Sequence, residues 1–403
     1  MSQKELSKYE VINKVINEGL KQKEAAKQLN LCERQIRRLK KKIKEQGAKG
    51  LVHGNRGKPS NNKLDETELK KIKKLLYKHY YDFYPGHASE KLEENHGIKR
   101  DSKTIRSIMM EEGLWKPRKG KKKSEHRQWR QRRSHYGELE QFDGSYHKWF
   151  EDRYTKCCLL LAVDDATNKI TYGKFDEHET VFAVFEFWSE YLAKNGKPVS
   201  IYLDKFSTYR MSQQVAIENP DIKTQFQRAM QELRIEPISA HSPEAKGRVE
   251  TTFGTLQNRL IKEMRLRGIS SPEEANKYLL EEFIPWFNAK YGLEPSGKTN
   301  LHVKMDKKEL KKLDNILCRH EQRTVQNDFT IGYNTQWYQI TPKQCVTVCK
   351  RDKVIVQEYR DGSVKVRLRG KFLNIIPILK QSKTQKTKQP WVIPATIKEP
   401  HIV

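Results

Sequence analysis

Three acidic residues in the middle of the chain are the strongest candidates for chemistry. Asp143 lies in the run FDGSYHKWF directly after a predicted strand, and Asp204 ends a later predicted strand in VSIYLDKFSTYR. Glu250 lies inside a predicted long helix that contains KGRVETTFG. Each residue taken singly has an ordinary explanation, because Asp-Gly is common in turns, a strand-end Asp is often a cap and a helical Glu is usually solvated.

Considered together, the three carboxylates predict a metal site. Two adjacent central strands of a sheet can bring Asp143 and Asp204 close together, and a helix packed across the sheet can place Glu250 beside them. Three clustered carboxylates repel one another unless cations lie between them, and such oxygen ligands suit Mg²⁺ or Mn²⁺. Two such ions would stabilise the attacking and leaving oxygens at a phosphodiester.

Other acidic and basic residues near these positions have competing interpretations. Asp164 and Asp165 are rival carboxylates at a strand end, and we interpret them as turn residues. Glu244 is the rival on the helix, where the helix dipole favours an acid in the first turn for structural reasons alone. Lys246 and Arg248 flank Glu250 and are candidate DNA contacts, although a pair between Lys246 and Glu250 within the helix is an equally good explanation.

The elements that must position the three carboxylates follow from the hydrophobic pattern. Between about residues 135 and 300 the pattern alternates between strands and helices, which predicts a central α/β domain. The predicted strands cover 138–142, 156–163, 169–175, 199–203 and 234–239, and the predicted helices cover 180–194, 222–233, 243–266 and 272–291.

The first region of the chain has the spacing of a helix-turn-helix. Apolar residues recur at helical spacing through residues 9–46, which fits three helices. Ala26 lies where two helices approach closely, and Asn30 follows where the turn favours a positive φ. The second helix of the motif would present side chains that suit base edges in a major groove: Arg34, Gln35, Arg37, Arg38 and Lys41. The alternative is a solvated basic helix face.

The remaining segments divide the chain into several domains. A second helical unit is either another DNA reader or a plain packing module, with Ile105, Ile108 and Met109 as its core stripe. Short β-rich runs from Thr324 onward predict a small C-terminal β-barrel. The predicted order is a helix-turn-helix domain, a linker, a second helical domain, a basic linker, the α/β core, the β-barrel and an extended tail, at 1–49, 50–63, 64–115, 116–134, 135–300, 301–380 and 381–403.

Composition restricts the class of partner. The 403 residues include 79 Lys and Arg against 51 Asp and Glu, a formal charge of +28, which indicates a polyanionic partner such as nucleic acid. No apolar run is long enough for a membrane span, and no signal-peptide core is visible. The six cysteines show no zinc-binding spacing, so we interpret them as reduced thiols, mostly in the core, of a cytoplasmic, nucleoid-associated protein.

The order of these motifs resembles a DDE transposase of a bacterial insertion sequence, most closely the ISNCY-type group. The resemblance covers nearly the whole chain and includes GLVHGNRGKPS, YDFYPGHASEKLEENHGI, FDGSYHKWFEDR and KGRVE in the expected order. It implies a ribonuclease-H-like, retroviral-integrase-like catalytic core and a metal triad of Asp143, Asp204 and Glu250. It also implies a C-terminal β-barrel that helps to bind DNA.

The expected function is therefore metal-dependent cleavage of DNA 3′ ends and their transfer to target DNA. The expected partners are double-stranded DNA, as terminal inverted repeats and as target, and a second copy of the chain, because pairing two ends requires at least a dimer. No nucleotide cofactor is expected, since the phosphate-binding Gly-rich loop is missing from the sequence. The alternatives are a non-enzymatic DNA-binding regulator with a scaffold-only core and a ribonuclease acting on RNA:DNA hybrids.

Overall fold

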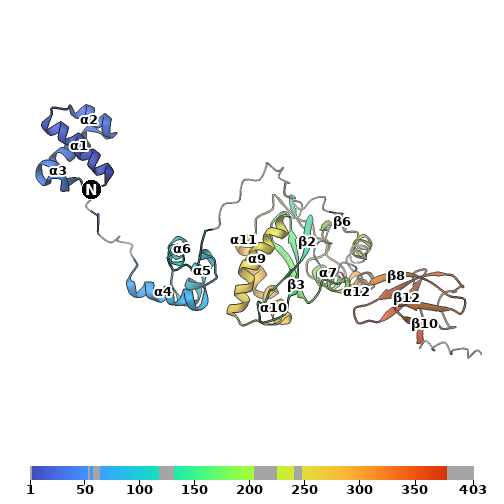
Figure 1. Ribbon diagram of the computed structural model, residues 1–403. Helices are drawn as coiled ribbons and strands as arrows, with labels where there is room; N and C mark the ends of the chain where they lie inside the picture. The colour runs from blue at the N-terminus through green and yellow to red at the C-terminus, as the bar shows by residue number, and fades with distance from the viewer. Residues whose placement is uncertain are drawn as a thin grey trace, which may run out of the picture. The chain divides into compact units, whose positions relative to one another are not determined.

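The structure is a computed structural model that describes residues 2–52, 55–57, 64–117, 131–203, 225–239 and 247–378. It divides into two compact units, Met1–Tyr81 and Asp82–Val403 (Figure 1). This boundary falls inside the second predicted domain, so its first helix is grouped with the N-terminal unit. Among the described residues, no helix is long and apolar enough to cross a membrane.

The N-terminal unit has the predicted helix-turn-helix. Asn30 ends the second helix with φ 49° and ψ 50°, the left-handed conformation that the turn requires. Ala26 and Ile36 are buried in the small core of this unit, as the apolar spacing predicted. The helices are α1 (Gln3–Asn17), α2 (Gln22–Leu29), α3 (Glu33–Gln46), the 3₁₀ turn η1 (Gly47–Leu51) and α4 (Glu66–His79).

The second unit begins with a helical hairpin of α5 (Pro85–His96) and α6 (Ser102–Glu111). Pro85 opens α5 at a position where no backbone donor is needed, and Gly97 ends α5 with a φ of 66°. Asp101 caps α6 by accepting from the backbone N–H of Lys103. The predicted core stripe, Ile105, Ile108 and Met109, is buried.

A five-stranded mixed sheet forms the centre of the second unit. Its strand order is β4-β3-β2-β5-β6, with β4, β3 and β2 antiparallel and β2, β5 and β6 parallel. This topology agrees with the predicted ribonuclease-H-like core. The strands are β2 (Leu139–His147), β3 (Cys157–Asp164), β4 (Ile170–Asp176), β5 (Ser200–Leu203) and β6 (Glu236–Ser239).

Strand β2 is longer than predicted, and this changes the place of Asp143. The sequence predicted that the strand ends at Phe142, before an Asp-Gly turn. In the structure β2 continues to His147 because β3 pairs with it over that length, with Tyr146 opposite Cys158. Asp143 therefore lies within the strand, and the prediction that it follows the strand is wrong.

Helices cover both faces of the sheet (Figure 1). One apolar core lies under α7 (Val181–Asn195) and the helical residues 225–232. The other core lies under three helices and contains Trp149, which is fully buried. These helices are α9 (Gly247–Leu266), α10 (Pro272–Tyr278) and α11 (Ile284–Tyr291), and a π-helical turn, Leu279–Phe283, joins the last two.

A short parallel pair and a helix lead from the core to the C-terminal strands. Strand β1 (His135–Tyr136) pairs with β7 (Gly297–Asn300), and α12 (Lys307–Ile316) follows. The predicted closed barrel is not observed in the described C-terminal residues, where the strands form two separate antiparallel sheets. One sheet has the order β14-β10-β9 and the other β13-β12-β11-β8, and the strands span Arg319–Thr324, Thr330–Tyr333, Gln336–Ile340, Lys353–Glu358, Val364–Leu368, Lys371–Leu373 and Ile375–Ile378 from β8 to β14.

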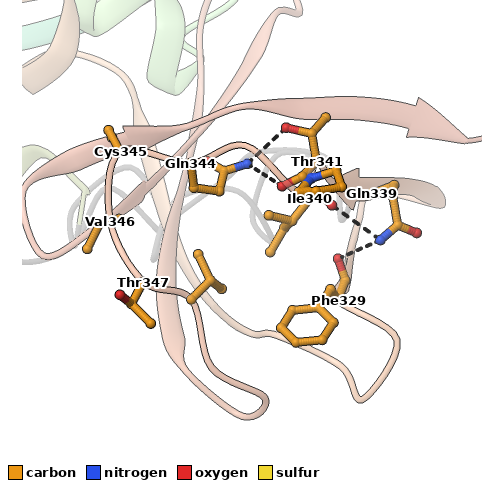
Figure 2. Close-up of a pocket in the computed structure, with 10 residues that line it drawn as sticks. Phe329, Gln339, Ile340, Thr341, Gln344, Cys345, Val346 and Thr347 are labelled. Carbon is orange, nitrogen blue, oxygen red and sulfur yellow. Dashed lines mark hydrogen bonds between the residues drawn. The ribbon is translucent and has the colours of Figure 1, made fainter.

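The division into two sheets has a local cause at Asn374, between β13 and β14. Its backbone N–H donates to Oε1 of Gln344 at 2.8 Å, and its carbonyl accepts from the Thr341 N–H at 3.1 Å. Gln344 also donates to the Thr341 carbonyl and hydroxyl, beside a cavity of about 710 Å³ (Figure 2). A side chain thus occupies the Asn374 N–H, while the Asn374 carbonyl continues the pairing of β10 with β14, and the chain passes from one sheet to the other at this residue.

The cysteines are divided between core and surface. Cys157, Cys158 and Cys318 are buried, whereas Cys32, Cys345 and Cys349 are exposed, and all six are free thiols. The prediction that most cysteines lie in the core therefore holds for only half of them.

Candidate active site

Asp143 lies on the face of the central sheet that α9 covers. Successive side chains of a strand point to opposite faces, so Gln141, Asp143 and Ser145 share one face of β2. Asp143 is half-buried. The neighbouring side chains Phe142 and Tyr146 belong to the apolar core on the other face.

Two contacts join α9, which carries Glu250, to β2, which carries Asp143. The backbone N–H of Val249 donates to Oε1 of Gln141 at 3.2 Å, and Nε2 of Gln257 donates to Oγ of Ser145 at 3.4 Å. These strand residues lie two positions before and two positions after Asp143, whereas the helix residues lie on either side of Glu250. Glu250 is exposed, at the start of the helix. The turn of α9 that carries Glu250 therefore packs on the sheet face of Asp143, and the shared site of the two carboxylates stays a prediction.

Asp165 anchors both β2 and α9. It is fully buried, and its Oδ1 accepts from Nε2 of Gln141 at 2.6 Å and from Nη1 of Arg248 at 2.7 Å. Its Oδ2 accepts from the backbone N–H of Arg133 at 2.9 Å. One carboxylate thus holds β2, the first turn of α9 and the segment before β1 in a fixed arrangement.

The two rival carboxylates at the end of β3 are both engaged in structural contacts. Asp164 accepts from the N–H and hydroxyl of Thr167 and from the N–H of Gly137, as a turn residue does. Asp165 lies in the same turn and holds Arg248. The ion pair gives Arg248 a structural partner, so the DNA contact predicted for it stays a prediction.

Several predicted site residues lie outside the described residues. Asp204 follows the last residue of β5, and Lys246 and the rival Glu244 precede α9, all within 204–224 or 240–246. Within the described ranges, no group of three or more His, Cys, Asp and Glu side chains could hold a metal ion. The described part of the predicted triad is Asp143 with Glu250.

The other end of α9 is fixed to α5 by a buried hydrogen bond and by ion pairs. Glu263 of α9 accepts from Nε2 of His87 at 2.8 Å and pairs with Nζ of Lys91 at 2.8 Å. Burial acts to raise the pKa of Glu263, but the hydrogen bonds from His87 and Lys91 outweigh it and lower the pKa to about 2. Burial lowers the pKa of His87, so this ring is neutral at pH 7 and donates to a charged carboxylate. Nearby, Arg259 pairs with Glu90 at 2.7 Å.

The predicted DNA-reading side chains lie on α3 of the N-terminal unit. Four of them are exposed, Gln35 is half-buried, and Ile36 between them is fully buried. Lys41 makes only a solvated pair with Glu45 at 3.8 Å. The exposed residues are Arg34, Arg37, Arg38 and Lys41.

The residues that position the site were missed at the sequence level. Gln141 and Ser145 were not singled out, although their spacing of two on either side of Asp143 is a signal for a shared strand face. Gln257 follows Glu250 by seven residues, which is the spacing of one helix face. No local sequence pattern indicated that Asp165 would contact Gln141, Arg248 and Arg133.

Comparison with known proteins places this arrangement in a family. A family model described as a winged helix-turn-helix matches residues 15–69. The chain is 37% identical over 373 residues to y4bF, a protein of Sinorhizobium fredii named as a transposase, covering 93% of this chain and 80% of the relative. It is 32% identical over 412 aligned positions to the transposase for insertion sequence IS1202 of Streptococcus pneumoniae, covering 93% and 86%. The chain belongs to the transposases of insertion sequences.

Retroviral integrase structures are also similar to parts of the chain. The catalytic core domain of HTLV-2 integrase, solved with magnesium, is 19% identical, covers 37% of this chain and 90% of its own, and has a TM-score of 0.27. A simian T-cell lymphotropic virus intasome in complex with a PP2A regulatory subunit is 14% identical, covers 76% of this chain and 98% of its own, and has a TM-score of 0.32.

Proposed function

We propose that this transposase binds the terminal inverted repeats of its insertion sequence and cleaves and joins DNA through Asp143, Asp204 and Glu250. The observation that supports the proposal is the pair of contacts, Val249 to Gln141 and Gln257 to Ser145, that packs the helix of Glu250 on the strand of Asp143. The sequence identity to two transposases over most of the chain supports the same class of reaction.

The side chains at this site fit a divalent metal. Asp143 and Glu250 supply carboxylate oxygens, which are the donors that Mg²⁺ and Mn²⁺ prefer, and Glu250 is open to solvent. Gln141 and Asp165 hold the backbone on which the two carboxylates sit. Two bound cations would stabilise the attacking and leaving oxygens at a phosphodiester.

The proposed reaction has two steps at the same site. In the first, a water oxygen bonds to the phosphorus at the element end while the bond from phosphorus to the 3′ oxygen breaks, which frees a 3′-hydroxyl. In the second, that hydroxyl oxygen bonds to a phosphorus of the target DNA and displaces another 3′ oxygen. The first step is hydrolysis of a phosphodiester and the second exchanges one phosphodiester for another, so neither requires ATP.

DNA recognition in this proposal belongs to the N-terminal unit. The exposed Arg34, Arg37 and Arg38 of α3 are suited to bases and phosphates of a major groove, and the net charge of +28 favours the duplex in general. The two ends of the element must be brought together, so the active form contains at least two copies of the chain.

The decisive experiment uses purified full-length protein and a labelled duplex that carries the element end, in Mg²⁺ or Mn²⁺. Asp143→Asn, Asp204→Asn and Glu250→Gln should each abolish nicking and joining but keep binding to the end. Asp152→Asn, which removes a carboxylate whose side chain is 99% exposed, is the matched control and should cleave normally. Specific binding without cleavage by the parent protein would instead indicate a regulator.

A further inference from the structure

A small basic pocket lies next to the candidate active site. Its volume is about 330 Å³, and it is lined by residues 131–134, Glu138 and Tyr202. Tyr202 of β5 pairs with Gln141 of β2 in parallel register, so the two side chains share the sheet face of Asp143. Gln141 precedes Asp143 by two residues, about 7 Å along the strand.

The segment that forms one wall of this pocket is fixed to the active-site elements. The Arg133 backbone N–H donates to Asp165, the same carboxylate that holds Arg248 of α9 and Gln141 of β2. The Ser134 N–H donates to Oε2 of Glu138 at 3.1 Å, and the Ser134 carbonyl accepts from the Gly297 N–H at 2.8 Å. The pocket and the candidate active site therefore belong to one rigid arrangement.

The charges in the pocket favour an anion. Nη1 of Arg132 donates to Oδ1 of Asn168 at 2.7 Å, a neutral acceptor, and within the described part of the chain no carboxylate lies within ion-pair distance of this guanidinium. Arg133 lies 3.5 Å from Glu138, whose other oxygen is engaged by backbone N–H groups. Among the described residues that line the pocket, two guanidinium groups thus accompany one carboxylate, that of Glu138, which leaves a net positive charge.

We propose that this pocket binds a backbone phosphate of the DNA strand close to the phosphodiester that is cleaved. Guanidinium groups bind phosphate through paired N–H donors. The proposal rests on the proposed function, because it takes Asp143 as the position of the cleaved bond.

The test combines substitutions in the pocket with removal of charge from single phosphates. Duplexes of the element end carry one methylphosphonate each, at successive positions around the cleaved bond. Their binding to full-length protein is measured by fluorescence anisotropy without divalent metal. The variants are Arg132→Gln with Arg133→Gln, the conservative Arg132→Lys, and Lys308→Gln as a control for loss of an exposed charge on α12.

On unmodified DNA the double variant should lose about tenfold in affinity, with a shallower dependence on salt, whereas Lys308→Gln should lose little. On the duplex that lacks the charge of one phosphate close to the cleaved bond, the double variant and the parent should bind equally. An equal loss on every duplex, or no greater loss than in the control, would overturn the pocket assignment.

The two proposals fail in distinguishable ways. Cleavage by the parent protein in Mg²⁺ tests the catalytic proposal, and the metal-free binding map tests the pocket. A parent that never cleaves but shows the position-specific loss would overturn the catalytic assignment while supporting the phosphate site. If the parent cleaves DNA but the loss of Arg132 and Arg133 does not change binding at any modified phosphate, the catalytic proposal is supported and the phosphate site is overturned.

Discussion

At the scale of single residues, Asp165 does more for the candidate active site than its place in a turn indicated. It is buried, and it accepts hydrogen bonds from Gln141, Arg248 and the backbone of Arg133. When one partner of a buried ion pair loses its charge, the other charge stays buried without an opposite charge beside it. The stability lost in this way is larger than the net contribution of the intact pair.

Asp165→Asn should therefore lower the free energy of unfolding by about 3 kcal/mol, because the Arg248 guanidinium loses its charged acceptor. Denaturant unfolding of the full chain measures this. The exposed Asp152→Asn should change the free energy by less than about 0.5 kcal/mol. An unfolding free energy unchanged in Asp165→Asn would show that the contact with Arg248 contributes no stability.

Glu263 predicts a pH dependence of stability. Its pKa in the folded protein is lowered to about 2, so its contribution is present above the unfolded value near 4.5 and is lost as the pH falls toward 2. The parent should exceed Glu263→Gln in unfolding free energy by about 3 kcal/mol at pH 7, and this difference should shrink between about pH 5 and pH 2. Denaturant titrations at several pH values measure the difference, with the exposed Glu281→Gln as control. A difference that does not vary with pH would contradict the role of the ion pairs.

At the scale of elements, α3 and α9 each have a buried packing face and carry residues that we propose act on DNA. In α3 the buried Ile36 and Ile43 hold the helix in its small core, which leaves Arg34, Arg37 and Arg38 exposed. In α9 the buried Val249 and its contact with Gln141 fix the turn that carries Glu250. The packing faces were predictable from apolar spacing alone.

Arg37→Gln should weaken binding to the inverted repeat by about tenfold and reduce discrimination against other duplexes, because an arginine that contacts a base edge contributes both affinity and specificity. Competition binding with specific and unrelated duplexes measures the two effects. Lys14→Gln on α1 removes one exposed charge as the matched control. If both variants weaken both duplexes equally, α3 contacts only the DNA backbone.

At the scale of the whole molecule, the chain has a formal charge of +28 and two compact units, which contain different candidate sites. The helix-turn-helix lies in the first unit, and the candidate active site and the basic pocket lie in the second. Binding to the element end through both units should therefore neutralise many phosphates and be strongly dependent on salt.

If the full chain makes on the order of 6–10 phosphate contacts, its affinity for the element end should fall about 10³- to 10⁵-fold between 50 and 200 mM salt. Anisotropy titrations over a range of NaCl concentrations give the slope. Residues 1–81 form a separate compact unit, and the same titration on that fragment should give a shallower slope. Equal slopes would indicate that the second unit does not contact DNA in the metal-free complex.

The sequence by itself determined the elements, because strand alternation, helical spacing and the left-handed turn at Asn30 are set by neighbouring residues. It also selected Asp143, Asp204 and Glu250 as candidates. The tertiary structure decided which distant residues meet, such as Asp165 with Arg248 and Glu263 with His87. It also decided that the C-terminal strands form two sheets, between which the Asn374 N–H donates to Gln344. Such contacts join positions up to 176 residues apart, and no local pattern specifies a partner that only packing brings near.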